Sequence, residues 1–140
     1  MPVPVEYKRA SMDFEQFMLD AREISGLATT HQTYTMVQGV FQAFRRRLDV
    51  KEAIGFANVL PPVLRALFVA DWDLDEPRRP FEDRAIMTRE VQSLRPGHNF
   101  APPTSIRDVA AALRKNIDQA GLDRVLIGLP PGARAFWQVD

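Results

Sequence analysis

The chain of 140 residues contains no cysteine and carries a formal net charge of zero. Without cysteine, disulfides, thiol catalysis and thiolate metal sites are all excluded. Because 18 basic residues balance 18 acidic ones, there is no overall positive field to attract nucleic acid or an anionic membrane. These absences argue against nucleic acid as a partner.

Long apolar runs are also missing. The first residues contain no apolar stretch long enough for a signal peptide. No segment approaches the roughly 18 uninterrupted apolar residues that indicate a membrane-spanning helix. We therefore expect a soluble, cytoplasmic protein without a membrane partner.

Glycine is scarce, and the common catalytic motifs are absent. The chain has seven glycines, and they form no glycine-rich phosphate loop. The serines lie at apparent helix ends or in loops, without a Gly-x-Ser-x-Gly elbow. We predict no catalytic residue and no cofactor, and the pattern favours a non-enzymatic protein while leaving an enzyme open.

What the chain does contain is an internal repeat. The stretch Leu60-Pro61-Pro62 returns as Leu129-Pro130-Pro131, an offset of 129 − 60 = 69. Proline fits the first turn of a helix, where its missing N–H would have had no partner. The pattern predicts an N-terminal tail (1–10), a first repeat (11–70), a linker (71–80) and a second repeat (81–140).

Apolar residues at helical spacing cover most of both repeats. The clearest example is the series Tyr34, Val37, Phe41, Phe44 and Leu48, whose spacing puts one face of a helix in the core. No segment alternates with period 2 for long enough to indicate a strand. We predict an all-α fold of two duplicated four-helix units, about eight helices, packed into one compact body. The expected helices span 12–25, 31–48, 50–59, 62–71, 81–93, 105–117, 119–127 and 131–138.

Several helix ends carry recognisable capping residues. Ser11 or Asp13 is expected to begin the first helix, and Gly26 can end it in the left-handed conformation. Asp49 and Glu52 have the spacing of a capping box at the start of the third helix.

The segment Leu60–Val69, the run Asp71-Trp72-Asp73 and the proline-rich joint before Phe81 resemble the bacterial family filed as domain of unknown function 2267. The resemblance covers about 12–137. It implies an all-helical tandem repeat and a bacterial cytosolic protein, and it implies no activity. One departure is Gly132, which stands where the first repeat has a valine and is expected to weaken the last helix by up to ~1 kcal/mol.

The linker carries acidic residues at the spacing of a calcium-binding loop. Asp71, Asp73, Asp75 and Glu82 match positions 1, 3, 5 and 12 of such a loop. Glu76, however, occupies the position where the sharp turn needs glycine, and two arginines follow it. We interpret the segment as a solvated acidic linker and predict no metal site.

The two histidines occupy the same place in both repeats. His31 and His98 are separated by 98 − 31 = 67 residues. If a pseudo-twofold axis relates the repeats, the pair could meet there, bind an ion or titrate between pH 5 and 8. The alternative is that each is a partly exposed residue near a helix N-terminus.

The loop that contains His98 is the candidate partner-binding surface. It spans Arg95–Ser105, is longer than its counterpart in the first repeat, and includes Asn99 and Phe100 outside any helical period. Its prolines reduce the freedom that would be lost on binding. Phe100 either packs under the next helix as a hydrophobic staple, the interpretation we favour, or is an exposed aromatic anchor for a protein partner or a second copy.

Two functions therefore stay open. The first is a non-enzymatic interaction or self-assembly module. The second is a ligand-responsive or enzymatic protein with a site in the groove between the repeats. Inward-facing polar side chains at the repeat interface would favour the second, and an apolar, filled interface the first. A third and weaker interpretation, nucleic-acid binding, would rest on the basic run Arg45-Arg46-Arg47 together with Lys51. The alternative is that Arg46 or Arg47 covers the C-terminal carbonyls of the helix at 31–48.

Overall fold

The computed structural model describes residues 3–139 and is all-α over that range, so the first two residues of the expected tail lie outside it. None of the helices in this range has the length and apolar character needed to cross a membrane. The helices are α1 (Val5–Lys8), α2 (Ala10–Ser25), α3 (Thr30–Arg45), α4 (Val50–Ala57), α5 (Pro62–Val69), α6 (Arg84–Ser93), α7 (Ser105–Asn116), α8 (Gln119–Ile127) and α9 (Ala133–Phe136).

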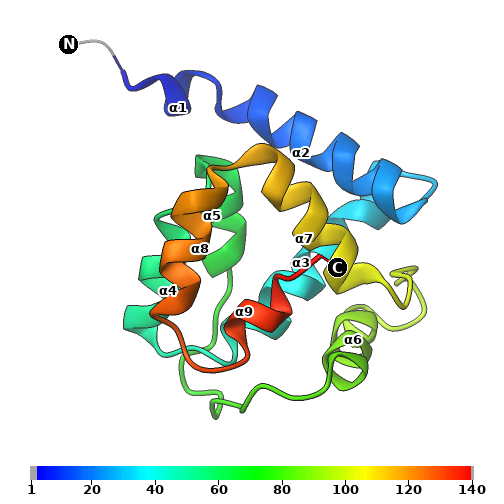
Figure 1. Ribbon diagram of the computed structural model, residues 1–140. Helices are drawn as coiled ribbons and strands as arrows, with labels where there is room; N and C mark the ends of the chain where they lie inside the picture. The colour runs from blue at the N-terminus through cyan, green and yellow to red at the C-terminus, as the bar shows by residue number, and fades with distance from the viewer. Residues whose placement is uncertain (1–2, 140) are drawn as a thin grey trace.

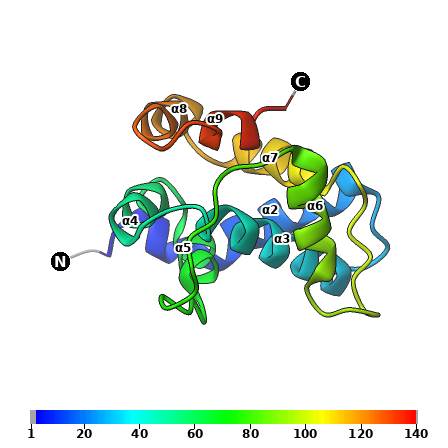
Figure 2. The ribbon, with the colours of Figure 1, turned by 90° about the horizontal axis from the view of Figure 1, so that it is seen from below.

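The helices of the two halves of the chain are intertwined. Helix α2 packs mainly against α7, and α6 packs mainly against α3, while α4 contacts α8. Figures 1 and 2 show α2 beside α7, and α6 on the side of the molecule away from α4, α5 and α8. Each half therefore supplies a helix that covers the other half, and the chain forms one compact body.

An aromatic cluster joins the two halves at the centre of the core. The ring of Phe44 lies 4.7 Å from that of Phe56 and 4.9 Å from that of Phe136, centre to centre. Trp137 stacks on Phe56 at 5.5 Å, with 23° between the ring planes. All four side chains are buried. Because the rings come from both halves, their burial requires the halves to be together.

Several predicted helix ends are confirmed. Gly26 ends α2 with a φ of 76°, in the left-handed region. The side chain of Asp49 accepts a hydrogen bond from the Glu52 N–H at 2.8 Å, and the side chain of Glu52 accepts one from the Asp49 N–H at 2.9 Å. This reciprocal pair is the predicted capping box, and it begins α4.

The N-terminal segment differs from the expected tail. Val5–Lys8 forms a short helix, and α2 begins one residue before Ser11. Neither Ser11 nor Asp13 caps α2; the N-cap residue is Arg9, which makes no side-chain capping bond. The physical reason is that helical backbone bonds continue through this segment: the Arg9 N–H donates to the carbonyl of Val5 at 3.0 Å, and the Asp13 N–H donates to that of Arg9 at 2.9 Å.

The last helix is much shorter than the predicted 131–138, because only Ala133–Phe136 is helical. The preceding Gly132 has a φ of 101°, a left-handed value that residues with a side chain rarely adopt. A Cβ on Gly132 would lie 2.5 Å from the Cβ of Phe81. Phe81 therefore packs on the turn before α9 and stays outside a helix, and α6 begins at Arg84 rather than at residue 81.

Candidate functional site

The loop between α6 and α7 is fixed in place by Asn99. Its Nδ2 donates hydrogen bonds to the carbonyls of Val91 (2.8 Å) and Leu94 (2.7 Å), at the C-terminal end of α6. Its Oδ1 accepts a hydrogen bond from the N–H of Ala101 at 2.9 Å. The polar atoms of Asn99 are thus used within the protein, and its role is to position the loop.

Two further side chains tie the loop to neighbouring helices. Gln92 of α6 donates from Nε2 to the carbonyl of Ala101 at 3.0 Å. Arg95 donates from Nη1 to the hydroxyl of Thr35 on α3, at 3.4 Å. The turn itself uses left-handed backbone at Arg95 (φ 55°) and Gly97 (φ 83°). The loop is therefore anchored to both α6 and α3.

Phe100 is exposed in this loop, so the favoured prediction of a buried staple is wrong. Its side chain is 59% exposed, whereas the next residue, Ala101, is 7% exposed. The reason is local: hydrogen bonds hold Asn99 and Ala101 against α6, and the side chain between them is left facing solvent. The structure therefore presents a single aromatic ring on a loop that hydrogen bonds hold in one conformation.

The two histidines, His31 and His98, are both exposed. No hydrogen bond or ion pair joins them among the interactions described for residues 3–139. Over the same range, no three histidine, aspartate or glutamate side chains are grouped so that they could hold a metal ion. A paired histidine site therefore stays a prediction.

Two of the acidic residues at the calcium-loop spacing, Asp73 and Glu82, have structural partners. Asp73 accepts a hydrogen bond through Oδ1 from the N–H of Asp75 at 2.9 Å, which stabilises a local turn. Glu82, the residue in the last calcium-loop position, instead accepts a hydrogen bond from Arg47 at 3.3 Å. This pairing gives a physical reason for the spacing that does not involve a metal.

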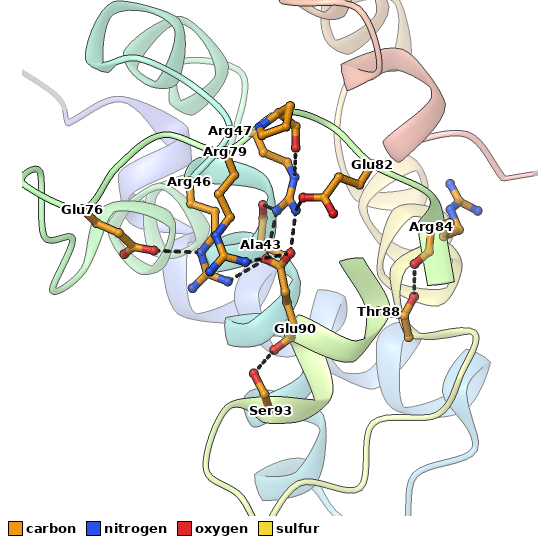
Figure 3. A network of polar contacts seen from close by, with 11 residues as sticks. Ala43, Arg46, Arg47, Glu76, Arg79, Glu82, Arg84, Thr88, Glu90 and Ser93 are labelled. Atoms are coloured by element: carbon orange, nitrogen blue, oxygen red, sulfur yellow. Dashed lines mark hydrogen bonds and ion pairs between the residues drawn. The ribbon is translucent and has the colours of Figure 1, made fainter. Parts of the chain in front are cut away.

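Arg47 is the centre of a buried polar network between the two halves (Figure 3). Its side chain has no exposed surface. Nε donates to the carbonyl of Pro80 at 2.9 Å, and Nη1 donates to the carbonyl of Ala43 at 2.7 Å and to Glu90 at 3.0 Å. Nη2 donates to Glu82 at 3.3 Å and to Glu90 at 2.5 Å. A guanidinium has five N–H groups, so every donor of Arg47 is occupied.

Glu90 of α6 gathers two more arginines at the same place. Arg46 Nη1 lies 2.9 Å and Arg79 Nη1 lies 3.5 Å from its carboxylate oxygens. Glu76 lies 3.4 Å from Nε of Arg46, and the N–H of Arg79 donates to the carbonyl of Arg46 at 3.0 Å. The network thus fastens the linker to the end of α3 and to α6.

The surroundings of Glu90 keep its carboxylate ionised. Burial by itself raises the pKa, but the hydrogen bonds and positive charges of Arg47 and Arg46 outweigh it, and the pKa lies below its ordinary value of 4.5. A carboxylate held in this way does not accept a proton at neutral pH, so it is unsuited to general-base catalysis. The network therefore has a structural role, in which its arginines are paired with its glutamates.

The basic run Arg45-Arg46-Arg47 is therefore divided among internal partners. Arg45 donates from Nη1 to the carbonyls of Phe68 (3.0 Å) and Ala70 (2.7 Å), at the C-terminal end of α5. Arg46 and Arg47 serve the network around Glu90. Only Arg47 covers a carbonyl of its own helix, that of Ala43. This arrangement lends no support to a nucleic-acid surface at the run.

A concavity of about 440 Å³ lies between the two halves and is lined by residues that include Arg47, Arg78, Pro130 and Pro131. Arg47 is fully engaged in the network, and Arg78 lies 3.8 Å from Glu52. The arginines of this concavity therefore have carboxylate partners within the protein.

The chain matches a protein-family model described as "Uncharacterized conserved protein (DUF2267)" over residues 14–136. The chain belongs to this family. No curated protein matches it. The match spans most of both predicted repeats, and the family description carries no activity.

The Arg47–Glu90 network was missed by sequence reasoning because the two residues are 43 positions apart and lie on helices assigned to different repeats. The sequence offers one weak indication of this network. At the predicted repeat offset of 69, Arg47 corresponds to Asn116, which is also polar (116 − 47 = 69). Asn116 donates from Nδ2 to Asp20 of α2 at 2.9 Å and to the carbonyl of Ala112 at 2.8 Å. In both halves a polar side chain at the end of the long helix reaches the first long helix of the other half.

Proposed function

We propose that this family member is a non-enzymatic interaction module that binds a protein partner, or a second copy of itself, through the surface around Phe100. The observation that carries the proposal is the exposure of this ring on a loop anchored by Asn99 and Gln92. Aromatic side chains dominate binding hot spots, and a loop that is already ordered loses less freedom on binding. His98 is exposed two residues away and would form the edge of the same surface.

The alternative was a ligand or enzyme site in the groove between the repeats. Inward polar side chains do occur there, and they are those of the Arg47–Glu90 network. Because all five donors of Arg47 have protein acceptors, its buried guanidinium offers no free group to a substrate. The aromatic cluster fills the centre of the core between the halves. Both features support the interaction module.

We also propose that the domain consists of two copies of one helical unit. Arg45 donates to the carbonyl of Phe68, and Arg114 donates to the carbonyl of Trp137 at 2.9 Å. The two donors are 69 residues apart, and so are the two acceptors. Equivalent contacts at the sequence offset support a duplication, with repeats at 11–70 and 81–140.

Phe100→Ala tests the interaction function. Because the ring is exposed, its removal should change the free energy of unfolding by no more than ~0.5 kcal/mol, as followed by thermal circular dichroism. Sedimentation velocity should show whether self-association is lost. Cross-linking in the native cell should show whether a partner seen with the wild-type chain disappears.

Ile127→Ala is the matched control, since Ile127 is 69% exposed and its helix, α8, lies on the other side of the molecule from α6 in Figure 1. It should keep any partner or self-association that Phe100→Ala loses. If Phe100→Ala keeps both its stability and all its associations, the loop is not the functional surface and the proposal fails.

A further inference from the structure

The chain around Phe100 has an excess of positive charge that the balanced composition of the whole protein conceals. Residues 84–107 include four arginines and a histidine but one acidic residue, Glu90. Glu90 is turned into the network, where Arg46 and Arg47 bind it. On this segment the one acidic charge is therefore used internally, whereas the five basic side chains are only partly so.

Two of the four arginines support the fold. Arg84 donates from Nη2 to the carbonyls of Ala135, Phe136 and Gln138, and Arg107 donates from Nε to the carbonyl of Val139 at 2.7 Å. Arg84 therefore fastens the end of α9 and the segment after it, and Arg107 fastens that segment.

The other two arginines are Arg89 and Arg95, of which Arg95 also ties the loop to α3 through the hydroxyl of Thr35. Both are exposed, and neither forms an ion pair with another residue within 3–139. Arg95 belongs to the loop itself. Arg89 is one helical turn before Gln92, whose side chain holds the carbonyl of Ala101, and residues three apart on a helix are neighbours. The exposed ring is thus accompanied by two arginines whose charge no carboxylate neutralises.

We infer that the partner recognised by this surface is an acidic protein segment, with an apolar side chain that contacts Phe100 and carboxylates that pair with Arg89 and Arg95. This inference rests on the proposed function and names the class of partner. Arginine binds carboxylates in a bidentate geometry and is more weakly hydrated than lysine. Complementary charge at the edge of an apolar contact sets specificity and the rate of association.

An acidic protein segment fits this surface better than nucleic acid. Single-stranded nucleic acids bind to series of aromatic side chains within a positive groove, and here one ring stands on a loop. The neutral net charge of the chain supplies no long-range attraction for phosphates. The two exposed arginines, Arg89 and Arg95, are sufficient to bind a few carboxylates.

The test starts from an unbiased probe, a random peptide library displayed on phage and selected against the full chain. Selected peptides are synthesised with a fluorophore, and their dissociation constants are measured by anisotropy. We expect enrichment of aspartate and glutamate next to an apolar residue. The double charge reversal Arg89→Glu with Arg95→Glu should weaken binding by about tenfold or more, and added salt should weaken it as well.

The control is Lys51→Glu with Arg124→Glu, which changes the net charge by the same amount on α4 and α8. Both of these residues are exposed, and in Figure 1 their helices lie on the other side of the molecule from α6. The control should bind as the wild-type chain does. Circular dichroism checks that every variant is folded. Because Arg95 also ties the loop to Thr35, Arg89→Glu alone should weaken binding as well, and it replaces the double variant if that variant does not fold.

The outcomes separate the partner class from the function itself. Peptides that depend on Phe100 but lack acidic enrichment, or that tolerate the double reversal, overturn the acidic partner and leave the interaction function standing. Two results count against both the acidic partner and the interaction function. One is that the selected peptides bind Phe100→Ala as tightly as the wild-type chain, and the other is that the selection yields no binding peptide. Binding of a single-stranded oligothymidylate that requires Arg89 and Arg95, without acidic peptides, overturns the inference in favour of nucleic acid.

Discussion

Glu90→Gln should destabilise the fold more than any other single neutralisation of a carboxylate in the chain. The Oε1 atom of Glu90 accepts hydrogen bonds from Arg46 and Arg47, and its Oε2 accepts another from Arg47 and lies near Arg79. Glutamine replaces one of these oxygens by an NH₂ group, which cannot accept a hydrogen bond and faces arginine donors. It also leaves the buried Arg47 without its main counter-charge.

The expected loss is about 3 kcal/mol, at the lower end of the range for breaking a buried ion pair, because the side chain of Glu90 retains 12% exposure. For a domain of this size that loss lowers the Tm by roughly 6–12 °C. Urea denaturation followed by circular dichroism measures the free energy of unfolding. A difference below ~1 kcal/mol would show that the network contributes little, and it would refute the reasoning.

The effect should also depend on pH in a defined direction. The pKa of Glu90 is lowered in the folded state, so the unfolded chain takes up the proton first as the pH falls. The stabilisation is complete above the ordinary value of 4.5 and is lost as the pH falls through the folded-state pKa. The difference between the wild-type chain and Glu90→Gln should therefore be largest at neutral pH and shrink in acid.

Glu23→Gln provides the matched control for this experiment. Glu23 stands 67 residues before Glu90, at the corresponding position of the proposed first repeat, and it is exposed on α2. Its replacement should change stability by no more than ~0.5 kcal/mol and should show little dependence on pH.

Three other changes test the fold. Gly132→Ala should cost about 2 kcal/mol or more in a urea titration, because its new Cβ would meet Phe81 at 2.5 Å with φ at 101°. Asp108→Asn should raise the Tm at pH 7, because burial raises the pKa of Asp108 and its ionisation therefore costs stability; the gain should fade as the pH falls through this raised pKa and be absent below the ordinary value of 3.8. Residues 1–76 and 77–140, made separately, should lack a cooperative melt by circular dichroism, because each fragment would lose the helices of the other half that cover it.

Each of these predictions has a result that contradicts it. Gly97→Ala, at a φ of 83° with no atom within 4 Å of a new Cβ, should cost less than Gly132→Ala; equal costs would mean that the contact with Phe81 is unimportant. A Tm for Asp108→Asn that is unchanged at every pH would argue against a raised pKa. Two half-chains that each melt near the temperature of the intact protein would show that the halves do not need one another.

The sequence by itself determined the all-α class and the approximate positions of most helices. Helical spacing of apolar residues, as in Val37, Phe41 and Phe44, reflects which face of a helix is buried, and that information is local. The capping box at Asp49 was predictable for the same reason, since its bonds join residues three apart. The exposed polar character of the linker was also readable from residues that are neighbours in the chain.

Tertiary structure alone decided how the helices pair and what the loop presents. Nothing in the local pattern shows that α2 packs on α7 and α6 on α3, because that choice depends on contacts between residues far apart in the chain. The same holds for Arg47, whose five acceptors come from three separate segments. Phe100 was assigned wrongly because its burial depends on where Asn99 and Ala101 are held, and those positions are set by hydrogen bonds to α6. The last helix is short because Phe81 occupies the space beside Gly132, a contact between residues 51 positions apart.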